Sequence, residues 1–271
     1  NNVIRHRFTL QGQIEFLNTG HSVFIGEGAG ANDDLSNNDN VFVGYLAGFT
    51  TTSGAANIAI GFQTLYNNDT GIYNTAVGAR ALNTNIDGES NVALGNHALG
   101  GNTIGSNNTA SGSFALNYNR AGDKATALGA LAMYYANNTA TSFTNTNVAV
   151  GYEALRGSLT PANNTGLNNT ALGYQTLVSN SSGSSNTATG KSALFNNDVG
   201  NNNTATGTNA LYTNSGGNSN TANGTNALKD NQTGDNNTAT GTNSLLTNTT
   251  GFSNTALGTN TMFSNTVGEQ N

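Results

Sequence analysis

The sequence predicts an all-β parallel β-solenoid, a β-roll of about fourteen 17-residue coils, on two observations. First, the phrase N-T-A-x-G-x-x-A-L recurs along the chain and is most complete at residues 169–177 and 203–211. Second, its glycine returns after one step of 18 residues, five of 17, two of 22 and five of 17. A fixed period is typical of solenoids, because each unit buries its apolar face by stacking on its neighbours. The anchor glycines are Gly26, Gly44, Gly61, Gly78, Gly95, Gly112, Gly129, Gly151, Gly173, Gly190, Gly207, Gly224, Gly241 and Gly258.

The composition excludes several classes of protein. Charged residues make up only 8% of the chain and glycine contributes 35 residues, but Gly, Asn and Thr recur at fixed positions, which argues against disorder. The net charge is −6 and the eight Lys and Arg residues form no stripe, so a nucleic-acid partner is not expected. Without cysteine there is no disulfide or thiolate metal site. No apolar run reaches the roughly 18 residues of a membrane span, so we expect no direct membrane insertion by this segment.

Residues 1–20 lie outside the register and are predicted to be lead-in strands or a joint to a preceding domain. Apolar and polar residues alternate at 8–10 and 14–16, which indicates two short strands around Gly12. The basic cluster at residues 5–7 is interpreted as a solvated edge or joint, with anion binding as the alternative.

Residues 21–271 form the repeat array. The chain begins without Met, and Asn271 falls one period after Asn254, where the next copy of the phrase would start. We therefore expect a segment of a longer protein in which the array continues beyond the C-terminus.

The first two coils differ from the later ones in their apolar residues. Phe24 and Phe42 occupy the position of the later alanine, and Gly30 and Gly48 occupy that of the later leucine. This exchange keeps the total side-chain volume nearly constant, as a packed core requires.

A second glycine follows ten residues after the anchor in most coils. Because glycine tolerates the positive φ of tight turns, two glycines per coil predict two short strands joined by two turns. In the N-T-A-x strand, pairs such as Ile58 and Ile60 share one face and are predicted to lie inside the coil. The intervening alanine would then face another chain.

Two further columns are predicted to be structural, with glycan contact as the alternative for the asparagines. A leucine four residues after the anchor would pack against the coils above and below, and buried Asn would hydrogen bond to its copy in the next coil. The leucine column includes Leu82, Leu99, Leu177 and Leu194. The asparagine column includes Asn74, Asn91, Asn108, Asn169, Asn186 and Asn203.

The two 22-residue steps are adjacent, which predicts two stacked insertions at residues 134–146 and 156–165. The alignment places Thr144 and Gly166 at equivalent points, three residues before the next column asparagine. Insertions in solenoids form loops on one face that is often a binding face. The alternatives are that the loops are merely tolerated or that they buttress a neighbouring chain. The candidate binding residues are Tyr134, Tyr135, Phe143, Arg156 and Pro161.

The phrases at residues 74–82, 147–155 and 169–177 resemble the head repeats of trimeric autotransporter adhesins. Residues 40–48 are similar to the related repeats of phage-type tail-fibre proteins. The resemblance implies a left-handed parallel β-roll, three chains side by side in a homotrimer, displayed outside the cell or on a virion or fibre surface. It further implies a role in adhesion to a glycan or protein receptor on a host cell, a prey cell or another surface.

Signals for chemistry are few, so a non-enzymatic protein without catalytic residues, metal or cofactor is expected. His6, His21 and His97 are far apart. The acidic group at residues 33–39 is interpreted as a solvated turn, with calcium binding as the alternative.

Two other functions are weighed against adhesion. The T-A-T sequences of the late coils resemble the threonine ranks of ice-binding solenoids, although these threonines occupy the positions assigned to the coil interior. The third hypothesis is a polysaccharide-degrading enzyme, which would need paired carboxylates on neighbouring coils.

Overall fold

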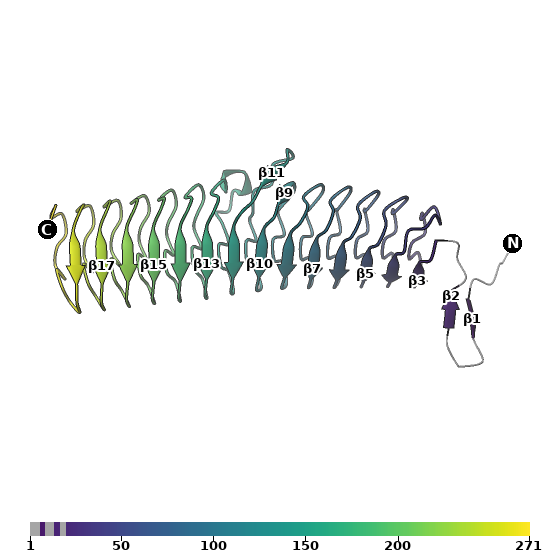
Figure 1. Ribbon diagram of the computed structural model, residues 1–271, viewed down its shortest axis with the longest axis horizontal. Coiled ribbons are helices and arrows are strands. Elements are labelled where there is room, and N and C mark those ends of the chain that lie inside the picture. The colour runs from purple at the N-terminus through teal and green to yellow at the C-terminus, as the bar shows by residue number, and fades with distance from the viewer. Residues whose placement is uncertain (1–5, 9–13, 17–19) are drawn as a thin grey trace.

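The computed structural model describes residues 6–8, 14–16 and 20–271. The chain is an all-β parallel β-solenoid of about fourteen turns with about 17 residues per turn, as the sequence predicts. Figure 1 shows the turns stacked into one elongated row, with the strands side by side along the molecule.

A single 14-stranded parallel sheet runs the length of the solenoid, and each strand pairs with those of the adjacent coils. Its strands are β3 (Val23–Ile25), β4 (Val41–Val43), β5 (Ile58–Ile60), β6 (Thr75–Val77), β7 (Val92–Leu94), β8 (Thr109–Ser111), β10 (Thr126–Leu128), β12 (Val148–Val150), β13 (Thr170–Leu172), β14 (Thr187–Thr189), β15 (Thr204–Thr206), β16 (Thr221–Asn223), β17 (Thr238–Thr240) and β18 (Thr255–Leu257). The other elements are the antiparallel pair β1 (His6–Phe8) and β2 (Ile14–Phe16), the parallel pair β9 (Gly122–Asp123) and β11 (Phe143–Thr144), and the 3-10 helix η1 (Pro161–Asn163).

The strands expected before the array are β1 and β2, in which His6 lies opposite Phe16. Of the other features predicted there, Arg5, Leu10 and Gly12 lie outside the described residues.

Each regular coil contains one strand, so the prediction of two strands per coil is wrong. The segment after the anchor glycine is a turn, because the residues two and four positions after it adopt a left-handed conformation. In one coil these are Gln63, with φ of 50°, and Leu65, with φ of 53°. This conformation costs a non-glycine residue about 1–2 kcal/mol. Full burial of a leucine contributes about 1.5–3 kcal/mol, which offsets that cost.

The strand faces are the reverse of those predicted from the sequence. Ala59 is fully buried, whereas Ile58 and Ile60 on either side are 40% and 41% exposed. The same pattern recurs along the sheet, with a buried alanine between two exposed or half-buried residues. The alanine column therefore fills the coil interior and cannot contact another chain.

The first coils show what the alanine packs against. Phe42 is fully buried, and a Cβ added at Gly48 would lie 2.3 Å from its ring. The middle strand position and the leucine position thus face each other across the interior. Elsewhere alanine and leucine share the space that phenylalanine and glycine fill here, which confirms the predicted exchange of volume.

The two glycines of a coil serve different purposes. The anchor glycines all have φ between 116° and 141°, a conformation that only glycine adopts easily. The second glycine, represented by Gly217, lacks a positive φ. A Cβ there would lie 2.4 Å from Asn214 Oδ1 and 2.5 Å from the Gly234 backbone oxygen. Close approach of neighbouring coils, not turn geometry, therefore requires the second glycine.

Two asparagine columns, the predicted one that includes Asn203 and a second that includes Asn214, are buried and bonded from coil to coil. The Asn203 backbone N–H donates to Asn186 Oδ1 at 2.9 Å, and its side-chain amide donates to the Gly217 oxygen at 2.8 Å. In the second column, Asn214 Nδ2 donates to the same Gly217 oxygen at 2.9 Å and to Asn197 Oδ1 at 2.8 Å. The columns satisfy buried polar groups that would otherwise oppose folding.

Candidate functional site

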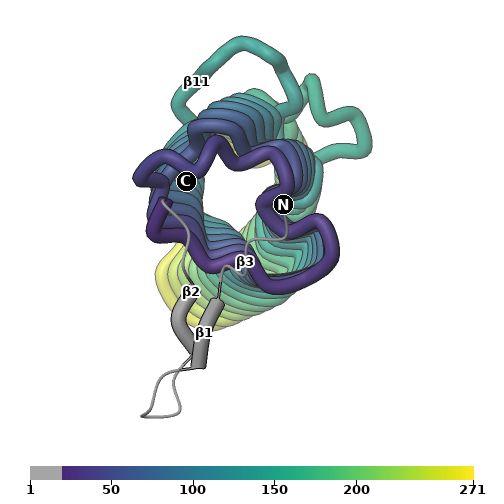
Figure 2. The backbone as a smooth tube through the Cα atoms, turned by 90° about the vertical axis from the view of Figure 1, so that its right-hand side faces the viewer, coloured from purple at the N-terminus to yellow at the C-terminus, as the bar shows by residue number. Residues whose placement is uncertain are grey.

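The two insertions protrude together from the solenoid. In Figure 2, which views the tube end-on, they extend on the side away from β3. Within the first insertion, β11 pairs with β9 so that Phe143 lies opposite Gly122 and Thr144 opposite Asp123. The alignment that placed Thr144 at the glycine position is therefore wrong by one residue, because the extra residue follows the pair.

The first insertion also completes the asparagine column. Ala125 replaces the column asparagine in this coil, so it offers no side-chain oxygen to the coil that follows. Asn145 supplies the missing acceptor: its Oδ1 accepts from the Asn147 amide at 2.9 Å and from the Asn147 backbone N–H at 3.3 Å. The second column is not repaired in the same way, since Asn119 Oδ1 is buried without a partner among the described residues.

Tyr134 and Tyr135, at the start of the first insertion, belong to an aromatic cluster. Their ring centroids are 4.5 Å apart, and the Tyr118 ring of the preceding coil packs against both, stacked on Tyr135 and edge-on to Tyr134. Phe114 contacts Tyr134 and stacks on His97 at 4.9 Å. Burial and the neighbouring Tyr118 raise the pKa of Tyr134, and burial with the positive charge of Arg80 lowers the pKa of His97.

Arg156 follows Tyr134 at the same position one coil later. Its Nη1 lies 3.3 Å from Glu153 Oε1, while Gln175 donates to Glu153 Oε2 at 2.8 Å. The Arg156 backbone oxygen accepts from the Tyr135 N–H at 2.8 Å, and its buried Nε has no partner among the described residues. The tyrosines, the Arg156–Glu153 pair and Gln175 therefore lie in three successive coils.

The remaining predicted binding residues lie within the insertions. Phe143 and Tyr135 line a cavity of about 30 Å3 together with Asn164, which donates to the Tyr135 backbone oxygen. That volume suits ordered water rather than a ligand. Pro161 begins η1 in the second insertion. The structure brings Tyr134, Tyr135 and Arg156 together and places Phe143 and Tyr135 on the wall of one small cavity, and among the described residues no contact joins Pro161 to them.

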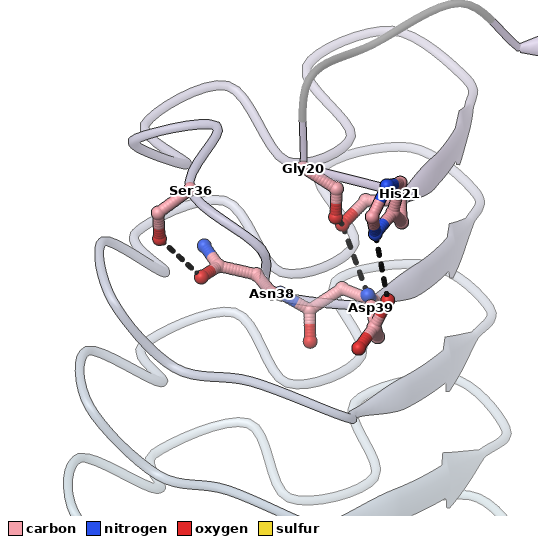
Figure 3. A network of polar contacts seen from close by, with 7 residues as sticks. Gly20, His21, Ser36, Asn38 and Asp39 are labelled. Carbon is pink, nitrogen blue, oxygen red and sulfur yellow. Dashed lines mark hydrogen bonds and ion pairs between the residues drawn. The ribbon is translucent and has the colours of Figure 1, made fainter.

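The acidic side chains at residues 33–39 contact separate partners. Asp33 accepts from the Leu35 N–H at 2.8 Å, and Asp39 lies 3.6 Å from the imidazole of His21. Hydrogen bonds from the hydroxyl and backbone N–H of Ser36, and then from Asn38, lower the pKa of Asp34. Figure 3 shows part of this network. In the part of the chain that the structure describes, no three His, Cys, Asp or Glu side chains gather to hold a metal ion.

A second candidate surface is the outer face of the sheet, formed by the first and third residues of its strands. The sequence pattern does not reveal this surface, because large aliphatic residues at these positions favour the coil interior. From β3 to β13 it carries mostly Val, Ile and Leu, and from β14 to β17 mostly Thr. The sequence did contain a signal for the correct orientation, since the exchange of Phe42 with Gly48 implies that the middle strand position points inward.

No known protein family, curated protein or solved structure matches the chain. The fold is thus established as a parallel β-solenoid without an assigned family. Among the described residues, no helix has the length and apolar character that crossing a bilayer requires.

Proposed function

We propose that the chain is a non-enzymatic segment of an extracellular fibre, displayed on a cell or virion surface and used for attachment to a glycan or protein receptor. Its resemblance to the head repeats of trimeric autotransporter adhesins and to tail-fibre repeats supports this role and favours a homotrimer.

The observation that carries the proposal is the outer face of the sheet. All-parallel sheets are normally covered on both faces, yet here Ile58, Ile60, Leu94 and Leu172 are exposed. Fourteen strands of three residues form a stripe about 65 Å long and about 10 Å wide. Its area is of the order of the roughly 800 Å2 that each partner buries in a stable interface. Association of identical chains through this stripe would remove its aliphatic side chains from water along the whole fibre.

The insertions are the proposed attachment surface. They project away from the sheet, so association through the outer face leaves them accessible (Figure 2). Tyr134, Tyr135 and Arg156 provide aromatic and cationic groups of the kind that dominate binding interfaces. Several copies on one fibre would bind a surface together, so weak individual contacts suffice.

Deletion of the insertions tests the attachment role. Removing five residues from each loop restores the 17-residue period, and removing residues 138–142 keeps Asn145 and the asparagine column intact. The shortened fibre, with Tyr134, Tyr135 and Arg156 also changed to alanine, should keep its circular-dichroism spectrum and its oligomeric mass but lose attachment to target cells. Attachment at the wild-type level would exclude the insertions as the binding surface.

Ice binding is the second candidate, because the threonines of the late coils lie on the outer face and not in the coil interior, where the sequence predicts them. Thr187 and Thr189 lie on the outer face in register with Thr204 and Thr206, in neighbouring strands of a parallel sheet. Regular hydroxyl and methyl groups on such a face resemble those of ice-binding solenoids, although Asn223 interrupts the array.

Ice-recrystallisation inhibition distinguishes the two functions. An ice-binding protein would show inhibition that Thr206→Tyr removes and Thr233→Tyr, an exposed change outside the sheet, retains. A fibre associated through the outer face would be inactive in this assay, because its threonines would be covered.

A further inference from the structure

A groove of about 570 Å3 follows the N-terminal coils on a part of the surface that belongs neither to the sheet nor to the insertions. Residues from five successive coils line this groove, and the central three coils contribute two lining residues each. The central lining residues are Thr50, Thr52, Asn67, Asp69, Thr84 and Ile86.

The direction of the groove follows from the register. Its central lining residues lie six and eight positions after the anchor glycine in three successive coils. The groove therefore runs parallel to the solenoid axis and advances by one coil, about 4.8 Å, at each step. Five coils give it a length of about 20 Å, and its volume lies within the range of about 300–1,000 Å3 found for ligand sites.

The groove presents a defined set of hydrogen-bonding groups. The Thr50 hydroxyl donates to the Tyr66 backbone oxygen at 3.0 Å and the Thr84 hydroxyl to the Gly100 oxygen at 2.7 Å, so both oxygens remain available as acceptors. The Thr52 hydroxyl donates to Asp69 Oδ1 at 2.5 Å. The side-chain amide of Asn67 makes no hydrogen bond to the described residues and is therefore available as a donor.

We propose that this groove binds an uncharged linear polysaccharide laid along the solenoid axis. Sugar hydroxyls both donate and accept, so they can satisfy the Asn67 amide and the acceptors of Thr50, Asp69 and Thr84. The Asp69 carboxylate, with no Lys or Arg in the lining, disfavours an anionic polymer. Ile86 offers an apolar contact for the C–H face of a pyranose ring. A surface that repeats once per coil also presents equivalent positions to a ligand that repeats once per sugar.

This inference rests on the proposed attachment role and adds a second contact surface, remote in sequence from the insertions. It is tested by isothermal titration of the whole chain with cellulose-, chitin- and starch-derived oligosaccharides, graded from disaccharide to hexasaccharide. Affinity for one series should rise with length until the ligand spans the groove.

Matched variants locate the binding. Asp69→Ala removes a charged hydrogen-bond acceptor from the groove and should weaken binding about tenfold or more. Asp198→Ala is the control, because Asp198 has the same coil position, accepts from Ser181 as Asp69 does from Thr52, and lies outside the groove lining. The control should bind like the wild type.

Failure of this inference is separable from failure of the fibre proposal. Absence of binding by all three series, or equal losses in Asp69→Ala and Asp198→Ala, overturns the groove even where the chain is oligomeric and attaches to cells. Oligosaccharide binding that Asp69→Ala abolishes supports the groove even where the wild-type chain is a monomer without attachment.

Discussion

Gly216 and Gly217 are neighbours in the chain with opposite surroundings. A Cβ at Gly217 would lie 2.4 Å from Asn214 Oδ1 and would displace both asparagine columns, because the Gly217 oxygen accepts from each. A Cβ at Gly216 would be no closer than 3.7 Å to another side chain. At the scale of single residues, the solenoid therefore depends on the space that a missing side chain leaves.

Substitution of each glycine by alanine tests this dependence. Gly217→Ala should destabilise the fold by about 1–3 kcal/mol, the usual cost of overpacking. Gly216→Ala should be neutral or stabilise it by about 0.4–1 kcal/mol, because alanine restricts the unfolded chain. Thermal denaturation of the two variants provides the comparison, and equal losses of melting temperature would contradict the packing explanation.

The sequence predicts which residues form the asparagine, leucine and glycine columns of the solenoid. It does not show why each of these residues is required. The period alone identifies the column asparagines and leucines. It cannot distinguish an anchor glycine, required for its positive φ, from Gly217, required for close approach, since both recur with the same period. Nor does the period show that Asn145 supplies the hydrogen-bond acceptor that Ala125 lacks, because the position of Asn145 depends on the path of an irregular loop.

At the scale of the strand, the decisive feature is which residues point inward. In β15, Ala205 is fully buried while Thr204 and Thr206 are exposed. Hydrophobic pattern alone suggests the opposite, because the aliphatic residues of the early strands occupy the outer positions. The interior is narrow enough that a leucine on the opposite wall leaves room only for alanine, and size therefore outweighs hydrophobicity.

Adjacent valine substitutions in β15 test the orientation. Ala205→Val adds two methyl groups to a filled interior and should cost about 1–3 kcal/mol. Thr204→Val changes an exposed position and should alter stability by less than about 0.5 kcal/mol. Valine has a higher strand propensity than alanine and one similar to threonine, so propensity alone would favour Ala205→Val, and a larger loss of melting temperature in that variant reports orientation. A larger loss for Thr204→Val would mean that the strand faces are reversed.

At the scale of the whole molecule, the coil number and parallel register were predictable because one coil repeats along the chain. The surface that joins molecules was not, since it depends on the strand orientation. With the orientation corrected, the outer face becomes the proposed contact between chains, and its threonine strands would be free only under the competing hypothesis. The insertions and the groove then occupy other parts of the surface.

A lysine on the outer face tests the association of chains. Ile60→Lys would place a charge in the proposed interface, where burying it without a partner is costly, and should reduce the mass measured by light scattering from that of a homotrimer to the 27.6 kDa of one chain. Ile104→Lys changes an isoleucine of similar exposure outside the sheet and should leave the oligomer intact. An oligomer unaffected by Ile60→Lys would place the contact elsewhere, and a wild-type monomer would favour the ice-binding alternative, because its outer face would be free.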